Sequence, residues 1–141
     1  MLDGLAGIRK STVARTVAQE ADSHGLLGAS FLFLRSEDDR KSAKLFFSTI
    51  AFQLSQYSQE IALHIGKALE RKPDASGKQL QDQLRDLIIQ PLQNCEQASK
   101  SAIVIVIDAL DECDEQDAER LLSLFLQEIH KVLNLKIFIT T

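Results

Sequence analysis

Glycine, lysine and hydroxyl side chains stand close together near the start of the chain, in the segment GLAGIRKST at residues 4–12. A phosphate-binding loop needs glycines so that its backbone N–H groups can approach the phosphates closely. It also needs a lysine that reaches the terminal phosphates and a hydroxyl that holds Mg²⁺, and the helix that follows adds its positive end. The residues that fit this pattern are Gly4, Gly7, Lys10 and Ser11. The segment therefore predicts a nucleotide site with Ser11 as a magnesium ligand.

Arg9 departs from this pattern, which has glycine at the same position. Its side chain stands where the backbone should press against phosphate, and a non-glycine residue at positive φ costs about 1–2 kcal/mol. We expect the bulk of Arg9 to displace the β- and γ-phosphates; the alternative is that its guanidinium adds a phosphate contact. Taken alone, the segment could also be a glycine-containing turn that only caps a helix.

An acidic cluster follows the most apolar stretch of the chain, IVIVI at residues 103–107. β-Branched residues without alternation favour a strand that is buried on both faces at the centre of a parallel sheet. Asp108 then lies at the carboxyl end of that strand, where open α/β sheets bind ligands, and suits a contact to Mg²⁺. Asp111 and Glu112 follow one turn later, where one of them could orient or deprotonate a water. The alternative is an acidic helix start that needs no ligand.

Helix-like and strand-like segments alternate along the rest of the chain, which favours an α/β domain with a mostly parallel sheet. Helices are predicted where apolar residues recur at spacings of three and four, and strands where short apolar runs are bounded by turn residues. The predicted helices cover residues 10–23, 43–54, 61–69, 80–88 and 117–133, and the predicted strands cover 29–34, 103–107 and 136–140.

Composition sets limits on the kind of protein. The chain has 141 residues, 45% of them hydrophobic and 26% charged, which is enough for one domain with a core. A net charge of −4 argues against a nucleic-acid partner, since such domains are usually basic. No apolar run is long enough to cross a membrane, and Cys95 and Cys113 are too few for a disulfide framework. We therefore expect a cytoplasmic protein without membrane or nucleic-acid partners.

At the level of motifs, the chain resembles the NACHT domain of fungal NLR-type (STAND) proteins and is closely similar to the nephrocystin-like N-terminal domain. The resemblance covers nearly the whole chain, so residues 1–141 are expected to form one partial nucleotide-binding domain. The segments that carry it are GLAGIRKSTVART (4–16), GASFLF (28–33), FFSTIAFQL (46–54), LIIQPL (87–92), IVIDALDEC (105–113) and KIFITT (136–141).

The resemblance implies a signalling module that binds ATP or GTP with Mg²⁺, hydrolyses it slowly and switches between a closed and an assembling, self-oligomerising state. Its implied partners in a full-length protein are an N-terminal effector domain and C-terminal repeats. The implied phosphate and Mg²⁺ contacts are Gly4, Gly7, Lys10, Ser11 and Thr12, with Arg9 inside the same loop. Asp108 is then the Walker B aspartate, and Asp111 and Glu112 are the acidic pair, with Glu112 as the general base.

The implied fold is a three-layer, mostly parallel P-loop NTPase sheet with helices on both faces. We expect it to be truncated at both ends, since little precedes the loop to form its first strand and the region after the sensor is missing. Two other interpretations stay open because of Arg9: a degenerate, non-hydrolysing interaction scaffold, and a gene fragment.

Overall fold

The computed structural model describes residues 2–33, 39–72, 79–96 and 100–140, with side chains from Thr12 onward in the first helix and from Leu45 onward in the second. The α-helices are α1 (Leu2–Ser23), α2 (Asp39–Tyr57), α3 (Gln59–Arg71), α4 (Leu80–Gln83), α5 (Gln90–Gln93) and α7 (Glu115–Glu128). A π-helix, η2 (Leu84–Ile89), joins α4 to α5, and two 3₁₀ helices, η3 (Leu110–Glu112) and η4 (Ile129–Lys131), flank α7. The strands are β1 (Leu27–Leu32), β2 (Ile103–Asp108) and β3 (Leu135–Ile139).

The three strands form one parallel sheet in the order β1-β2-β3, so the segment 103–107 is the central strand, as predicted. β2 is buried along most of its length because helices cover both faces of the sheet. Gly28 allows β1 to approach closely, since a Cβ at this position would lie 2.6 Å from Cγ2 of Ile103. The predicted α/β class with a parallel sheet and helices on both faces is confirmed.

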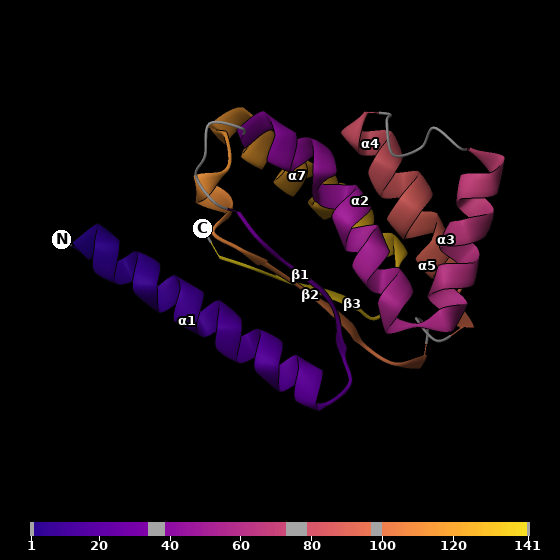
Figure 1. Ribbon diagram of the computed structural model, residues 1–141, viewed down its shortest axis with the longest axis horizontal. Helices are drawn as coiled ribbons and strands as arrows, with labels where there is room; N and C mark the ends of the chain where they lie inside the picture. Colours follow the sequence, from indigo (N-terminus) through magenta and orange to yellow (C-terminus); the bar gives the residue numbers. More distant parts are fainter. Residues whose placement is uncertain (1, 34–38, 73–78, 97–99, 141) are drawn as a thin grey trace.

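The two faces of the sheet are covered unequally. Figure 1 shows α1 alone on one face and the other helices together on the opposite face. The larger layer forms the core with Ile103, Ile105 and Ile107, and it contains a cluster of aromatic rings: Phe31, Phe33, Phe46, Phe47 and Phe125. Phe46 and Phe47 are both fully buried in this cluster.

Helix α1 packs on the other face through small side chains, with Ala14 and Ala21 buried against the sheet. Its carboxyl end is fixed by a glycine turn, in which Gly25 has a φ of 71°. The Tyr57 hydroxyl at the end of α2 donates a hydrogen bond of 2.7 Å to the carbonyl oxygen of Gly25, and burial raises the pKa of this phenol. α2 therefore helps to set where α1 meets β1.

Several predicted boundaries are wrong. The first helix begins at Leu2 and not at Lys10, so the segment 4–12 lies within α1 and not in a loop. Leu5, Ala6 and Arg9 all favour the helix, and a right-handed helix is the low-energy conformation for a non-glycine residue at position 9. Shifts at other boundaries are smaller: β1 begins two residues earlier than predicted, and the α-helical part of α7 ends at Glu128 and gives way to η4.

The predicted helix 80–88 also differs, because it widens into the π-helix η2 and continues to Gln93. Pro91 has no N–H and cannot donate to the carbonyl oxygen of Leu87, four residues earlier. The wider turns end just before this proline, at Ile89, so the helix passes through Pro91 without a break.

One side chain, Gln53, covers the backbone groups of Ser30 on the outer edge of β1. The backbone N–H of Ser30 donates to Oε1 of Gln53 at 2.9 Å, and Nε2 of Gln53 donates to the carbonyl oxygen of Ser30 at 2.8 Å. The amide of Gln53 thus satisfies the same donor and acceptor that a neighbouring strand would pair with. Exposed edges of this kind are templates for pairing with other chains.

We predict that Gln53→Leu lowers the free energy of unfolding by about 1 kcal/mol and increases self-association, because it opens the edge at Ser30. Urea unfolding and sedimentation velocity would measure the two effects. Gln56→Leu is the matched control, since Gln56 is exposed on the same helix. Equal self-association in the two variants would show that apolar character alone, and not the lost edge contact, is responsible.

Candidate functional site

Asp108 ends the central strand on the side of the sheet that α1 covers. Ile103, Ile105 and Ile107 point into the core, and alternation along the strand turns Asp108 toward the opposite face. All three strands are parallel, so their carboxyl ends meet at this edge. Asp108 therefore stands where open α/β sheets bind their ligands, as predicted from the sequence.

Thr140 fixes the Asp108 carboxylate in place. The Thr140 hydroxyl donates a hydrogen bond of 2.5 Å to Oδ1 of Asp108 and accepts one of 2.8 Å from the backbone N–H of Ala109. Backbone bonds from Thr140 N–H to the carbonyl oxygen of Ile107, and from Leu110 N–H to that of Thr140, hold the threonine between the two strand ends. Sequence reasoning missed Thr140, although its place directly after a strand of the same sheet is a usable signal.

Ala109 turns the chain away from the strand with a left-handed conformation, φ 60° and ψ 44°. A residue with a Cβ pays about 1–2 kcal/mol for this conformation, and such strain is concentrated at functional sites. The turn leads into η3, which contains the predicted acidic pair: Asp111 is exposed and Glu112 is half-buried. The pair therefore follows Asp108 by one short turn, outside the wall of the cavity described next.

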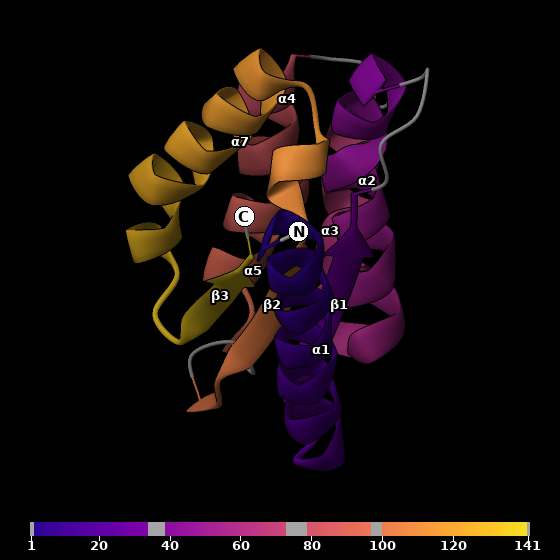
Figure 2. The same cartoon turned by 90° about the vertical axis from the view of Figure 1, so that its left-hand side faces the viewer.

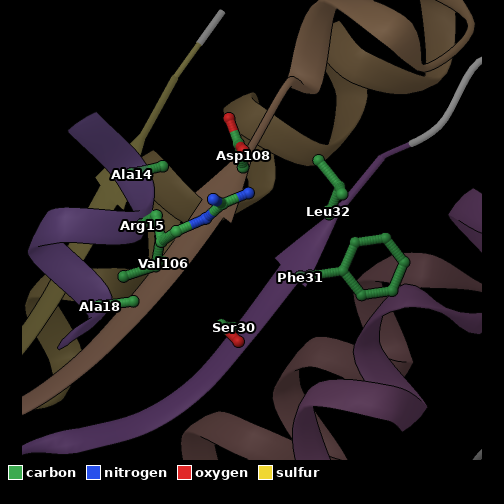
Figure 3. Close-up of a pocket in the computed structure, with 8 residues that line it drawn as sticks. All are labelled: Ala14, Arg15, Ala18, Ser30, Phe31, Leu32, Val106 and Asp108. Atoms are coloured by element: carbon green, nitrogen blue, oxygen red, sulfur yellow. The ribbon is translucent and has the colours of Figure 1, made fainter. Parts of the chain in front are cut away.

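A cavity of about 280 Å³ lies between α1 and the carboxyl half of the sheet (Figure 3). Its wall is mostly apolar and carries one cation, Arg15, and one carboxylate, Asp108. The residues that line it are Ala14, Arg15, Ala18, Ser30, Phe31, Leu32, Val106 and Asp108. Sequence reasoning also missed Arg15, although it follows Ser11 by four residues, which places both on one side of a helix.

The other predicted site residues belong to the first turns of α1. Gly4, Gly7, Arg9, Lys10, Ser11 and Thr12 all lie within this helix, and the side chains of the first five are outside the described set. Along α1, Lys10 lies one turn before Ala14, and Ser11 one turn before Arg15. The amino-terminal part of α1 reaches past the carboxyl ends of the strands (Figure 1), so this end of the helix and Asp108 are on the same side of the sheet.

Groups of three or more His, Cys, Asp or Glu side chains that could hold a metal ion are absent from the part of the chain that the structure describes. Within the same residues, no helix is long and apolar enough to span a lipid bilayer.

We predict that Thr140→Val lowers the free energy of unfolding by about 1–3 kcal/mol, because Ala109 N–H and Oδ1 of Asp108 both lose a hydrogen-bond partner in a part-buried site. Chemical unfolding followed by circular dichroism would measure the change. Thr140→Ser keeps the hydroxyl and should retain most of the stability; a loss in Thr140→Ser as large as in Thr140→Val would contradict the prediction, because serine retains the hydrogen-bonding group.

Comparisons with known proteins agree with one part of the resemblance. A family model described as nephrocystin 3, N-terminal, matches residues 1–141. No curated protein and no solved structure matches the chain. The match spans the sheet, α1 and the residues around Asp108 alike, and the chain belongs to the nephrocystin 3 N-terminal family.

Proposed function

We propose that the chain binds a nucleoside triphosphate, ATP or GTP, with Mg²⁺ at the carboxyl edge of its sheet and hydrolyses it slowly, as the switch module of a NACHT-type P-loop NTPase. The observation that carries the proposal is the position of Asp108: it ends the central parallel strand and faces the helix that contains Lys10 and Ser11. In a full-length cytoplasmic protein, the module would act with an effector domain, repeats and further copies of itself.

Each residue of the proposed nucleotide site has its own role. Lys10 attracts the terminal phosphates, and Gly4, Gly7 and Thr12 belong to the segment that wraps them. Asp108 and Ser11 supply oxygen ligands, which suit Mg²⁺. The fit of Asp108 is supported by its hydrogen bonding: Oδ1 is held by Thr140, while Oδ2 accepts no hydrogen bond from any described residue.

When bound, Mg²⁺ would neutralise charge on the phosphates. Glu112 is the proposed general base, and Asp111 assists in orienting water. Both lie on η3, directly after the strained turn at Ala109 that redirects the chain.

Phosphate binding requires a change in the first turns of α1. A helix hides its backbone N–H groups in internal hydrogen bonds, whereas a phosphate-binding loop turns them toward the ligand. Gly4 and Gly7 reduce the cost of this change, since each glycine weakens a helix by about 1 kcal/mol. Arg9 opposes it, because a side chain at this position favours the helix that α1 forms.

The same feature supports a second candidate function, a non-hydrolysing scaffold. If Arg9 keeps residues 4–12 helical, the fold persists without a phosphate loop, and the domain contributes only surfaces for assembly. Continuity of α1 from Leu2 to Ser23 favours this alternative for this particular chain. Nucleotide binding decides between the two.

The nucleotide proposal predicts that the purified chain binds ATP or GTP in the presence of Mg²⁺ and that Lys10→Ala loses this binding, because the lysine supplies the charge that reaches the terminal phosphates. Equilibrium binding of labelled ATP and GTP would test this, with circular dichroism to show that both proteins are folded. Hydrolysis assays with Glu112→Gln would follow. Absence of binding by the folded chain would favour the scaffold.

We further expect Arg9→Gly to raise nucleotide affinity by about 5- to 30-fold, which corresponds to removing a penalty of about 1–2 kcal/mol at positive φ. Arg9→Ala is the matched control: it removes the guanidinium but keeps a Cβ. A gain in Arg9→Gly alone assigns the effect to the backbone, and a gain in both variants assigns it to bulk or charge. If Arg9→Gly binds no nucleotide either, the enzymatic proposal fails.

A further inference from the structure

Arg15 is the cation in the wall of the α1–sheet cavity, and its side chain is exposed to solvent. Its side chain extends from α1 toward the end of β2, where Asp108 lies (Figure 3). Among the residues that the structure describes, the side chain of Arg15 forms no ion pair and no hydrogen bond. Within the same residues, the ion pairs that do form join Lys72 and Arg85 to Asp86, and Lys131 to Glu128.

The surroundings of Arg15 favour a ligand rather than a structural role. The remaining wall is formed mainly by Ala14, Ala18, Val106 and Leu32, which offer no counter-charge. The nearest carboxylate along the wall, Asp108, already has Oδ1 occupied by Thr140. The apolar wall beside the exposed Arg15 side chain would strengthen its interaction with an anion that enters the cavity.

The side-chain chemistry indicates which anion fits. A guanidinium presents several N–H donors in a planar fork, which pairs with two oxygens of one phosphate group. Asp108 at the opposite side of the same cavity repels a bare anion, so such an anion is best accommodated when a cation accompanies it. Magnesium-bound polyphosphate meets both conditions.

We propose that Arg15 is a second phosphate-contacting residue, which binds an oxyanion of the polyphosphate while Lys10 serves the terminal phosphates. This inference rests on the proposed function, because it places Arg15 at the same nucleotide site. It adds a specific claim: the cavity between α1 and β2, and not only the segment 4–12, receives part of the polyphosphate.

The experiment measures equilibrium binding to the full chain by isothermal titration, with Mg·ATP, Mg·GTP and Mg·tripolyphosphate as probes. We expect Arg15→Gln to weaken binding of all three about tenfold and to reduce the salt dependence of binding, because one charge contact is lost. Arg15→Lys keeps the charge without the fork and should weaken binding less. Arg120→Gln is the matched control, since Arg120 is an exposed arginine on α7, on the far face of the sheet (Figure 2).

Four outcomes are distinct. Weaker binding in Arg15→Gln with normal binding in Arg120→Gln supports the inference. An effect on the nucleotides but not on tripolyphosphate would overturn it, because Arg15 would then contact the nucleoside. Unchanged binding in Arg15→Gln, while Lys10→Ala abolishes binding, overturns the inference and leaves the proposed function intact. Binding of no probe by the folded, unaltered chain overturns both.

Discussion

The hydrogen bonds around Thr140 hold together the part of the molecule on which any chemistry at this edge depends. Thr140 joins the end of β3 to the end of β2 and fixes the carboxylate of Asp108 at the same time. Without it, the strained conformation of Ala109 would have no partner for its N–H, and the path of the chain into η3 would lose its anchor. A single hydroxyl thus connects the geometry of the sheet with the orientation of the acidic residues that follow.

The two layers of helices contribute very differently to stability. The layer that contains α2, η2 and α7 buries the aromatic cluster and most large aliphatic side chains. Helix α1 offers mainly alanines to the sheet and leaves a cavity beside Arg15. Because buried apolar area sets most of the packing energy, α1 is held less firmly than the opposite layer. A helix held in this way can rearrange its first turns without disturbing the core, which is what phosphate binding would demand.

The sequence predicts those features that depend on local pattern. The central strand follows from the β-branched residues 103–107, and the position of Asp108 follows from the strand, because the carboxyl edge of a parallel sheet is fixed by topology. Thr140 and Arg15 could not be found in this way. Their roles depend on contacts with Asp108 across long separations in the sequence, and each residue alone looks like an ordinary strand end or solvated helix position.

The start of α1 could not be predicted either, since residues 4–12 carry two competing signals. The glycines and Lys10 match a phosphate loop, while Arg9 and its neighbours favour a helix, and the helix prevails. The helix predicted over residues 80–88 also has a different end, because a π-helix absorbs the hydrogen bond that Pro91 cannot make and the segment continues to Gln93.

The amide of Gln53 distinguishes the two edges of the sheet. It closes the β1 edge at Ser30, whereas the parallel register turns the outward backbone groups of Leu135, Ile137 and Ile139 on β3 away from β2, with no partner among the described residues. A strand from another polypeptide would therefore meet a side chain already bonded to Ser30 on the β1 edge, and three residues with outward donors and acceptors on the β3 edge. One glutamine side chain thereby makes the two edges of the sheet unequal as sites for strand pairing.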